Sequence, residues 1–225
     1  MMTTAKMTVA IIIFFACISL SLSKVVFKEQ FDTDPFAHPS RWSKSSDSKY
    51  AGQPVSYLPG PNPVLGYEDD KGLQLTQEMK NYGFGAKFSE ILDTKNSDVI
   101  VQYEVKLVDT LSCGGAYVKL LRDDIDIVDL KDSTPYTIMF GPDRCGQTNK
   151  VHFILQHQNP VTQKWEEKHA KDMPAIMTDR LSHLYTLVVR SDNSFEVFID
   201  KESKKKGSLL SDMEPPVNPP AEIGE

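Results

Sequence analysis

The sequence predicts an all-β protein built as a sandwich of antiparallel strands. Apolar and polar residues alternate with a period of two in several segments, which is typical of half-buried strands. No segment shows the longer period of an amphipathic helix. Loops rich in Pro, Gly, Asp and Ser separate the alternating segments. Strands at short spacing without helices between them favour an antiparallel sandwich or jelly roll.

The first 23 residues are interpreted as a signal peptide and not as part of the fold. Lys6 precedes an apolar run, and Ser21 and Ser23 provide small residues at a cleavage site. The run is shorter than the roughly 20 apolar residues that a membrane-spanning helix needs, so we expect no membrane anchor in this chain. We therefore expect one secreted domain at residues 24–225. Its mildly acidic charge, −6 for the whole chain, argues against a nucleic-acid partner.

The expected strands follow one another along the chain. In residues 99–107, the odd-numbered positions are apolar or tyrosine and form the buried face, whereas Gln102, Glu104 and Lys106 point to solvent. Residues 191–194 read Ser-Asp-Asn-Ser, a turn sequence that predicts a hairpin between its flanking segments. The expected strands are 25–31, 99–107, 117–121, 136–145, 151–157, 184–190 and 195–200.

Two cysteines remain once the signal peptide is removed, because Cys17 lies within it. In an oxidising compartment an even pair predicts a disulfide between Cys113 and Cys145. Closing that loop would stabilise the fold by roughly 3–4 kcal/mol in the chain-entropy model. Neither CxxC nor HxxxH accompanies the pair, which argues against a zinc site.

Tyr117 and Lys119 raise the first functional hypothesis. They are two residues apart, so on a strand they share a face, while the residues between and beside them are apolar and can face the core. The predicted disulfide would bring Tyr136 and Asp143 close to them. Aromatic rings with charged groups suit a sugar, whose faces stack on rings and whose hydroxyls need hydrogen bonds. The alternative is an ordinary cross-strand Tyr–Lys pair on a solvated face.

Further residues leave more than one interpretation open. Tyr136 and Met139 differ by three positions, so a regular strand cannot point both into one site and a bulge or a bend at Gly141-Pro142 is required. His152 and His157 are typical of surface or packing positions. The sequence contains neither GxSxG nor HExxH. Asp143 and Glu167 would suit glycoside hydrolysis only if the fold set them close together.

Several stretches resemble the calnexin and calreticulin family. The block between the cysteines carries most of the resemblance, and the similarity extends over essentially all of residues 24–225. The stretches are VVFKEQF (25–31), DKGLQL (70–75), CGGAYVKLL (113–121), PYTIMFGPDRCG (135–146), KVHFILQHQNP (150–160), EEKHAK (166–171), SHLYTLVVRSDNSFEVFID (182–200) and DMEPPVNPP (212–220).

The resemblance implies a concanavalin-like jelly roll of two antiparallel sheets, incomplete at its C-terminal edge. It implies calcium-dependent binding of monoglucosylated N-linked glycans on newly made glycoproteins in the lumen of the endoplasmic reticulum. This is a lectin chaperone activity and not an enzyme. The sugar-contacting positions would be Tyr117, Lys119, Tyr136, Met139, Asp143 and Glu167. The Ca²⁺ positions would be Gln30, Asp70 and Lys71, partly through main-chain oxygen, and the disulfide would join Cys113 and Cys145.

The resemblance also shows where this sequence differs from the family. In the family a proline-rich arm follows the PPVNP segment (215–219) and recruits a thiol-disulfide oxidoreductase, so that partner is expected only if an arm exists. The returning chain then completes the sandwich, whereas this sequence stops at Glu225. We therefore expect weak glycan binding or none. The alternatives are a glycan-independent holdase for unfolded polypeptide and a glycoside hydrolase on the same scaffold.

Overall fold

The computed structural model describes residues 24–37, 40–59 and 70–218. Within these ranges the chain contains strands and loops but no helix, as the alternation predicts. Residues 1–23, the predicted signal peptide, lie outside the described residues. The strands are β1 (Ser43–Lys44), β2 (Val55–Pro59), β3 (Lys71–Leu75), β4 (Phe84–Gly85), β5 (Val99–Lys106), β6 (Cys113–Gly115), β7 (Val118–Leu121), β8 (Tyr136–Cys145), β9 (Thr148–Gln158), β10 (Trp165–Ala170), β11 (Ser182–Val189), β12 (Ser194–Ile199), β13 (Glu202–Ser208) and β14 (Met213–Glu214).

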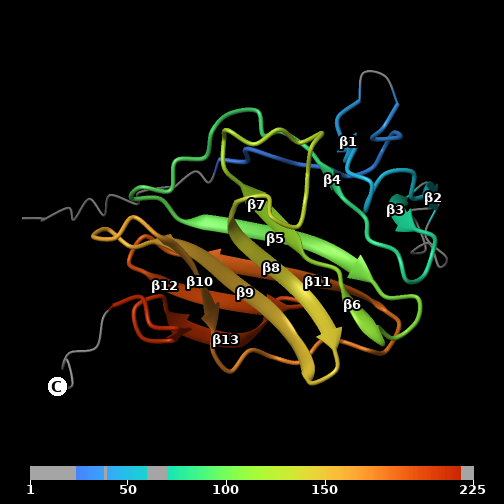
Figure 1. The fold of residues 1–225 in the computed structure, drawn as a ribbon. Coiled ribbons are helices and arrows are strands. Elements are labelled where there is room, and N and C mark those ends of the chain that lie inside the picture. Colours follow the sequence, from blue (N-terminus) through green and yellow to red (C-terminus); the bar gives the residue numbers. More distant parts are fainter. Residues whose placement is uncertain (1–23, 38–39, 60–69, 219–225) are drawn as a thin grey trace, which may run out of the picture.

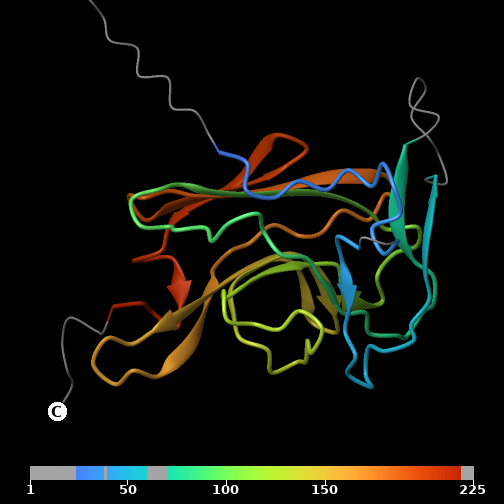
Figure 2. The same ribbon diagram turned by 90° about the horizontal axis from the view of Figure 1, so that it is seen from above.

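Two antiparallel sheets form the body of the molecule. One has the order β14-β10-β9-β8-β6, with β7 also pairing with β8, and the other has the order β13-β12-β11-β5. The sheets lie face to face, which is clearest from above (Figures 1 and 2). Two short ribbons, β1-β4 and β2-β3, complete the described strands. The expected jelly-roll sandwich is therefore confirmed, and its two large sheets are not closed into a barrel.

The core lies between the sheets, where the alternating faces meet. Phe153 of β9 and Phe195 of β12 pack edge to face across the sandwich, with ring centroids 5.1 Å apart. Both rings are almost fully buried. Tyr103 of β5 packs against Phe140 of the opposite sheet and Tyr185 of its own sheet. Each buried phenylalanine adds about 2–3 kcal/mol of apolar transfer free energy, so these layers stabilise the sandwich.

Most of the predicted strands are confirmed. The 99–107 segment becomes β5, with Gln102 and Glu104 exposed on its outer face as expected. The predicted hairpin becomes β11 and β12, paired in register from Tyr185 to Val189. Its turn closes with the amide of Arg190 donating to the carbonyl of Ser194.

The prediction of a strand at residues 25–31 is wrong. The described part of the chain contains no strand paired along this segment, which is anchored in other ways. Ser89 donates to the carbonyl of Val26 through both its amide and its hydroxyl. The ring of Phe27 packs against Trp42 and Phe88. An alternating sequence forms a strand only where a neighbour supplies the ladder of hydrogen bonds, so its apolar residues dock as a loop here.

An ion cluster centred on the buried side chain of His183 joins β11 to the end of β12. His183 contacts Asp200 through Nδ1 and Asp179 through Nε2, each at 2.7 Å. Burial opposes the charged form, but the hydrogen bonds to both carboxylates outweigh it and raise the pKa of His183 above its ordinary value. The cluster therefore fastens the chain that enters β11 most firmly when the imidazole is protonated.

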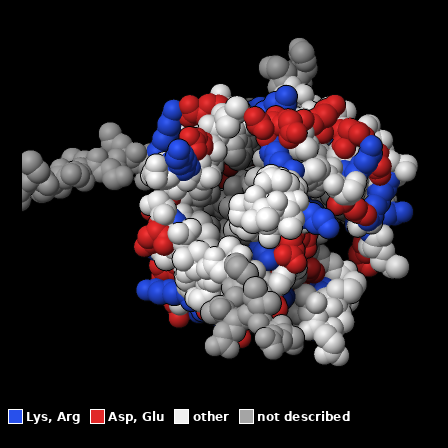
Figure 3. All heavy atoms as spheres, turned by 60° about the vertical axis from the view of Figure 1, so that its left-hand side comes forward, with Lys and Arg blue, Asp and Glu red and all other residues white. Residues whose placement is uncertain are grey.

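Charged side chains of both signs are interspersed over the face shown in Figure 3. This mixture accords with the moderate net charge of −6. Within the described residues, no helix is long and apolar enough to cross a membrane.

Candidate carbohydrate site

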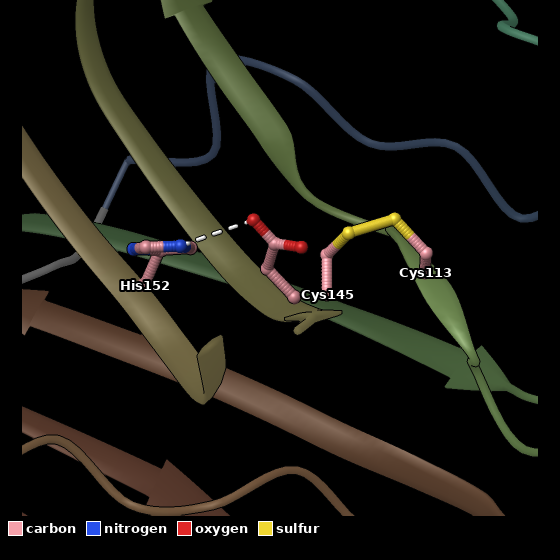
Figure 4. Close-up of a disulfide and its surroundings, with 4 residues drawn as sticks. Cys113, Cys145 and His152 are labelled. Atoms are coloured by element: carbon pink, nitrogen blue, oxygen red, sulfur yellow. Dashed lines mark hydrogen bonds and ion pairs between the residues drawn. A yellow bond between two sulfur atoms is a disulfide. The ribbon is translucent and has the colours of Figure 1, made fainter. Parts of the chain in front are cut away.

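The predicted disulfide is present and organises one end of the candidate site. Cys113 of β6 and Cys145 of β8 are directly paired across the two strands and their sulfurs are bonded. Figure 4 shows this bridge, with His152 on the neighbouring strand. Two residues further along β6, Gly115 pairs with Asp143. The bridge therefore fixes the register that sets Asp143 beside the Cys-Gly-Gly segment.

The ring of Tyr117 lies over Gly115. A Cβ atom on Gly115 would stand 2.2 Å from the Cε1 atom of the Tyr117 ring, so only glycine leaves room for it. Gly141 lies opposite this break between β6 and β7, with a φ of +139° that favours glycine. Tyr103 reaches up from the other sheet and donates to the carbonyl of Ala116 at 2.7 Å. These contacts turn the chain so that the Tyr117 ring is 40% exposed at the surface of the sheet.

A bulge in β8 places Tyr136 and Met139 on one face, as the sequence required. Leu120 pairs with Ile138 but Leu121 pairs with Tyr136, so Thr137 is the extra residue. At this bulge the Thr137 hydroxyl donates to the carbonyl of Leu120 at 3.0 Å. Met139 pairs with Lys119, and directly paired residues share a face. Lys119, Tyr136 and Met139 therefore belong to one face of this sheet, the face opposite the core.

Lys119 lies between the two tyrosines. Its ammonium is 4.6 Å from the centroid of the Tyr136 ring and 6.0 Å from that of Tyr117. Burial lowers the pKa of Lys119 below its ordinary value, while Glu167 and Asp132 act against this. A cation flanked by rings and weakly hydrated can donate to neutral oxygen atoms such as sugar hydroxyls.

Glu167 of β10 completes this group. The Tyr136 hydroxyl donates to Glu167 Oε1 at 2.5 Å, and His169 Nε2 is 3.2 Å from Oε2. Burial raises the pKa of Tyr136 above its ordinary value, and the bond to Glu167 raises it further. The phenol therefore keeps its proton, and the carboxylate retains lone pairs for another donor.

Asp143 lies further along the sheet. His152 Nε2 is 3.1 Å from Asp143 Oδ2, the contact dashed in Figure 4. Burial lowers the pKa of His152, outweighing the opposite influence of Asp143, so the ring is neutral and donates through Nε2–H. Asp143 is four residues beyond Met139 on β8, which is about 13 Å along a strand. The site is therefore elongated, with Tyr117 and Asp143 at one end and Tyr136 and Glu167 at the other.

Several further side chains on this face were not predicted from the sequence. His152, predicted to be a surface or packing residue, contacts Asp143. Ile154 packs with Tyr136 and Met139 in a small apolar cluster. Gln156 pairs with Glu167. The sequence did contain a usable pattern. His152, Ile154 and Gln156 alternate along β9 with the core residues, so all three must lie on the face opposite the core.

Tyr57 contacts Lys71 and the residue next to Gln30, and no described hydrogen bond joins the predicted calcium residues Gln30, Asp70 and Lys71 to one another. The Tyr57 hydroxyl donates to the carbonyl of Phe31, next to Gln30, at 2.6 Å. The Lys71 ammonium lies 5.3 Å from the centroid of the Tyr57 ring. Among the described residues, no group of three or more His, Cys, Asp or Glu side chains is placed to hold a metal.

The predicted donor set has the ligand types that Ca²⁺ prefers but too few ligands to complete its coordination shell. An amide oxygen from Gln30, a carboxylate from Asp70 and a main-chain carbonyl are hard ligands of the type Ca²⁺ prefers. Gln30 also lines a shallow hollow of about 360 Å³ with Asp32 and Thr33. Since Ca²⁺ takes six to eight oxygens, these residues could supply only part of a coordination shell.

Comparison with known proteins decides the family. The model of the calreticulin family matches residues 27–225. The chain belongs to the calreticulin family. A calnexin homolog of Aspergillus fumigatus is 44% identical over 211 residues, which cover 88% of this chain and 37% of that protein. Calmegin of Bos taurus is 47% identical over 160 residues, which cover 68% of this chain and 26% of that protein.

The fold comparison agrees. The T. cruzi calreticulin globular domain superposes with a TM-score of 0.72 at 34% identity, and the match covers 84% of this chain and 67% of that one. The chain spans roughly a quarter to two-fifths of the length of the curated relatives it matches. Membership of this family supports a lectin chaperone domain.

Proposed function

We propose that residues 24–225 form a calcium-dependent lectin chaperone domain for monoglucosylated N-linked glycans on newly made glycoproteins. Its place would be the lumen of the endoplasmic reticulum, in agreement with the predicted signal peptide and disulfide. The domain would retain unfolded glycoproteins and assist their folding through reversible binding.

One observation carries the proposal, namely the elongated row of rings and hydrogen-bonding groups on the outer face of the β8–β9–β10 sheet. Lys119 between two tyrosine rings suits a sugar ring at one position. Glu167 and Asp143 stand toward opposite ends of the row. A ligand that engages both ends must be several sugars long, which suits an oligosaccharide and not a single hexose.

The two carboxylates are held by separate partners. Glu167 pairs with Gln156 of β9 and Asp143 pairs with Lys150, six residues apart along that strand, so their main chains are roughly 20 Å apart at about 3.3 Å per residue. Their side chains lean toward each other, because Asp143 contacts His152, Glu167 contacts His169, and the rings of these two histidines are 6.4 Å apart. Each carboxylate is thus bound to its own histidine, an arrangement that suits contact with different sugars of one ligand.

Ca²⁺ would act as a structural ion. Gln30, Asp70 and the main chain near Lys71 would supply oxygen ligands, and an ion bound only to the native state stabilises it. We therefore expect the ion to raise the melting temperature of the domain. Its proposed ligands lie outside the sugar-binding face.

The test is isothermal titration of the 24–225 chain with a monoglucosylated oligomannose glycan, with the unglucosylated glycan as control. Saturable binding of the first glycan alone, weak as the sequence leads us to expect but lost in Tyr117→Ala and Lys119→Ala, supports the proposal. A glycan-independent holdase would instead suppress aggregation of an unfolded, unglycosylated protein equally well in wild type and both variants, without binding either glycan. Saturable binding that survives both substitutions would refute the proposed site.

A further inference from the structure

Next to the proposed sugar site, an arginine stacks on a tryptophan. Arg122 follows β7, and its guanidinium carbon lies 3.6 Å from the centroid of the Trp165 ring on β10. Trp165 pairs with Gln158 at the start of β10, two residues before Glu167. The arginine side chain therefore extends across the outer face of the sheet, from the end of β7 to β10, beside the Tyr136–Glu167 end of the site.

The guanidinium of Arg122 donates a hydrogen bond to one glutamine side chain. Arg122 Nη2 donates to Gln156 Oε1 at 3.0 Å. Its Nε–H is buried and has no partner among the described residues. Stacking on Trp165 and the bond to Gln156 are thus the described contacts that hold the group in place, and a planar guanidinium held this way has little freedom to turn.

This bond decides the orientation of the Gln156 amide. A guanidinium only donates, so the oxygen of the amide must face Arg122 and the NH₂ group must face away from it. Gln156 shares its face with Ile154 and His152 of the same strand and pairs directly with Glu167. Its NH₂ group therefore belongs to the site, next to a carboxylate that only accepts. The Gln156 amide also acts to lower the pKa of Tyr136, in agreement with an N–H directed toward that phenol oxygen.

A donor beside an acceptor is the arrangement that recognises one hydroxyl group. We propose that Gln156 is a further sugar-contacting residue, whose N–H donates to a hydroxyl that in turn donates to Glu167, and that Arg122 is the positioning residue that fixes this amide. The inference rests on the proposed glycan-binding function and extends it by naming a selective contact to a hydroxyl of the glucose. Trp165 contributes indirectly, by holding the guanidinium flat.

The experiment compares three variants of the 24–225 chain by isothermal titration. Gln156→Met keeps the length of the side chain but removes its donors. Arg122→Met keeps the stem against Trp165 but removes the guanidinium. Gln158→Met is the matched control, because it makes the same change one row further along the same strand, at an exposed position. The ligands are the monoglucosylated oligomannose glycan and four forms of it, each lacking one hydroxyl of the glucose.

We expect Gln156→Met to bind the parent glycan about tenfold more weakly, Arg122→Met about threefold more weakly, and Gln158→Met as tightly as wild type. One deoxy ligand should lose about tenfold on wild type but clearly less on Gln156→Met, because the amide part of the contact is already absent there and only the bond of that hydroxyl to Glu167 is left to lose. A purely structural role for Gln156 would instead weaken all five ligands equally. Thermal unfolding verifies that each variant is folded, and Gln156→Ala replaces the methionine variant if that one is not.

The outcomes separate the two proposals. A wild-type chain that binds no glycan overturns the proposed function and the contact role of Gln156 with it. Suppose that the wild-type chain binds the glycan. If Gln156→Met then binds it equally well, or binds all five ligands more weakly by the same factor, only the contact role of Gln156 is overturned. Equal affinity of Arg122→Met and wild type overturns the positioning role of Arg122.

Discussion

Replacing Gly115 by alanine should displace the ring of Tyr117 without unfolding the domain. The added Cβ would lie 2.2 Å from the ring, a distance that no folded protein tolerates, so the ring must move. Because Tyr117 is at the surface, the ring can swing toward solvent. Gly114 is the matched control, since a Cβ there meets only Leu111 at an ordinary contact distance of 3.6 Å.

The magnitude follows from what the ring contributes. A sugar that covers roughly 40–60 Å² of the ring face gains about 1–1.5 kcal/mol at 25 cal/mol per Å². The contact between Lys119 and Tyr117, at 6.0 Å, exists in the free chain as well, so it adds nothing further to the loss of affinity. The affinity for the glycan should therefore fall by about 1–1.5 kcal/mol, or roughly five- to twelvefold. Alanine in a strand is favoured over glycine by about 0.5–1 kcal/mol, which offsets lost packing, so stability should change little.

Titration calorimetry with the monoglucosylated glycan measures the affinity, and urea unfolding measures the stability. Gly115→Ala should bind weakly and unfold near the wild-type midpoint, whereas Gly114→Ala should match wild type in both. Wild-type affinity in Gly115→Ala, or equal losses in both variants, would refute the assigned position of the Tyr117 ring.

Three further predictions concern stability. Phe153→Ala should cost about 3–5 kcal/mol, measured by urea unfolding, because the ring is almost fully buried between the sheets and leaves a cavity. Cys145→Ser should cost about 3–4 kcal/mol, measured the same way, because the disulfide closes a separation of 32 residues in the unfolded chain. His183→Gln should reduce stability most at acidic pH: the raised pKa of His183 gives stability that is complete below the unfolded value of about 6.5 and is lost as pH rises through the folded value. Melting curves of wild type and variant should therefore converge as pH increases.

Each of these predictions has a clear contrary result. A loss below about 1 kcal/mol in Phe153→Ala would mean that the two sheets are not packed as described. Equal stability of Cys145→Ser and wild type under oxidising conditions would argue against the bridge. A difference between His183→Gln and wild type that grows as pH rises would reverse the sign assigned to the ion cluster.

The sequence by itself determined the class of the fold, most of the strands and the disulfide. Period-two alternation reports which residues of a strand face the core, because a pleated strand turns successive side chains to opposite sides. The same rule showed that Tyr136 and Met139 need a bulge to share a face. The cysteine pair could be assigned because only two cysteines lie outside the predicted signal peptide.

The tertiary structure alone decided which distant segments meet. Residues 25–31 alternate like a strand, but strand formation depends on a partner that local sequence does not specify. The register of β8, β9 and β10 likewise separates Asp143 from Glu167 and joins Gln156 to Glu167. Register arises from packing between strands far apart in the chain, so no local pattern could show that the site is elongated or that Arg122 reaches across it.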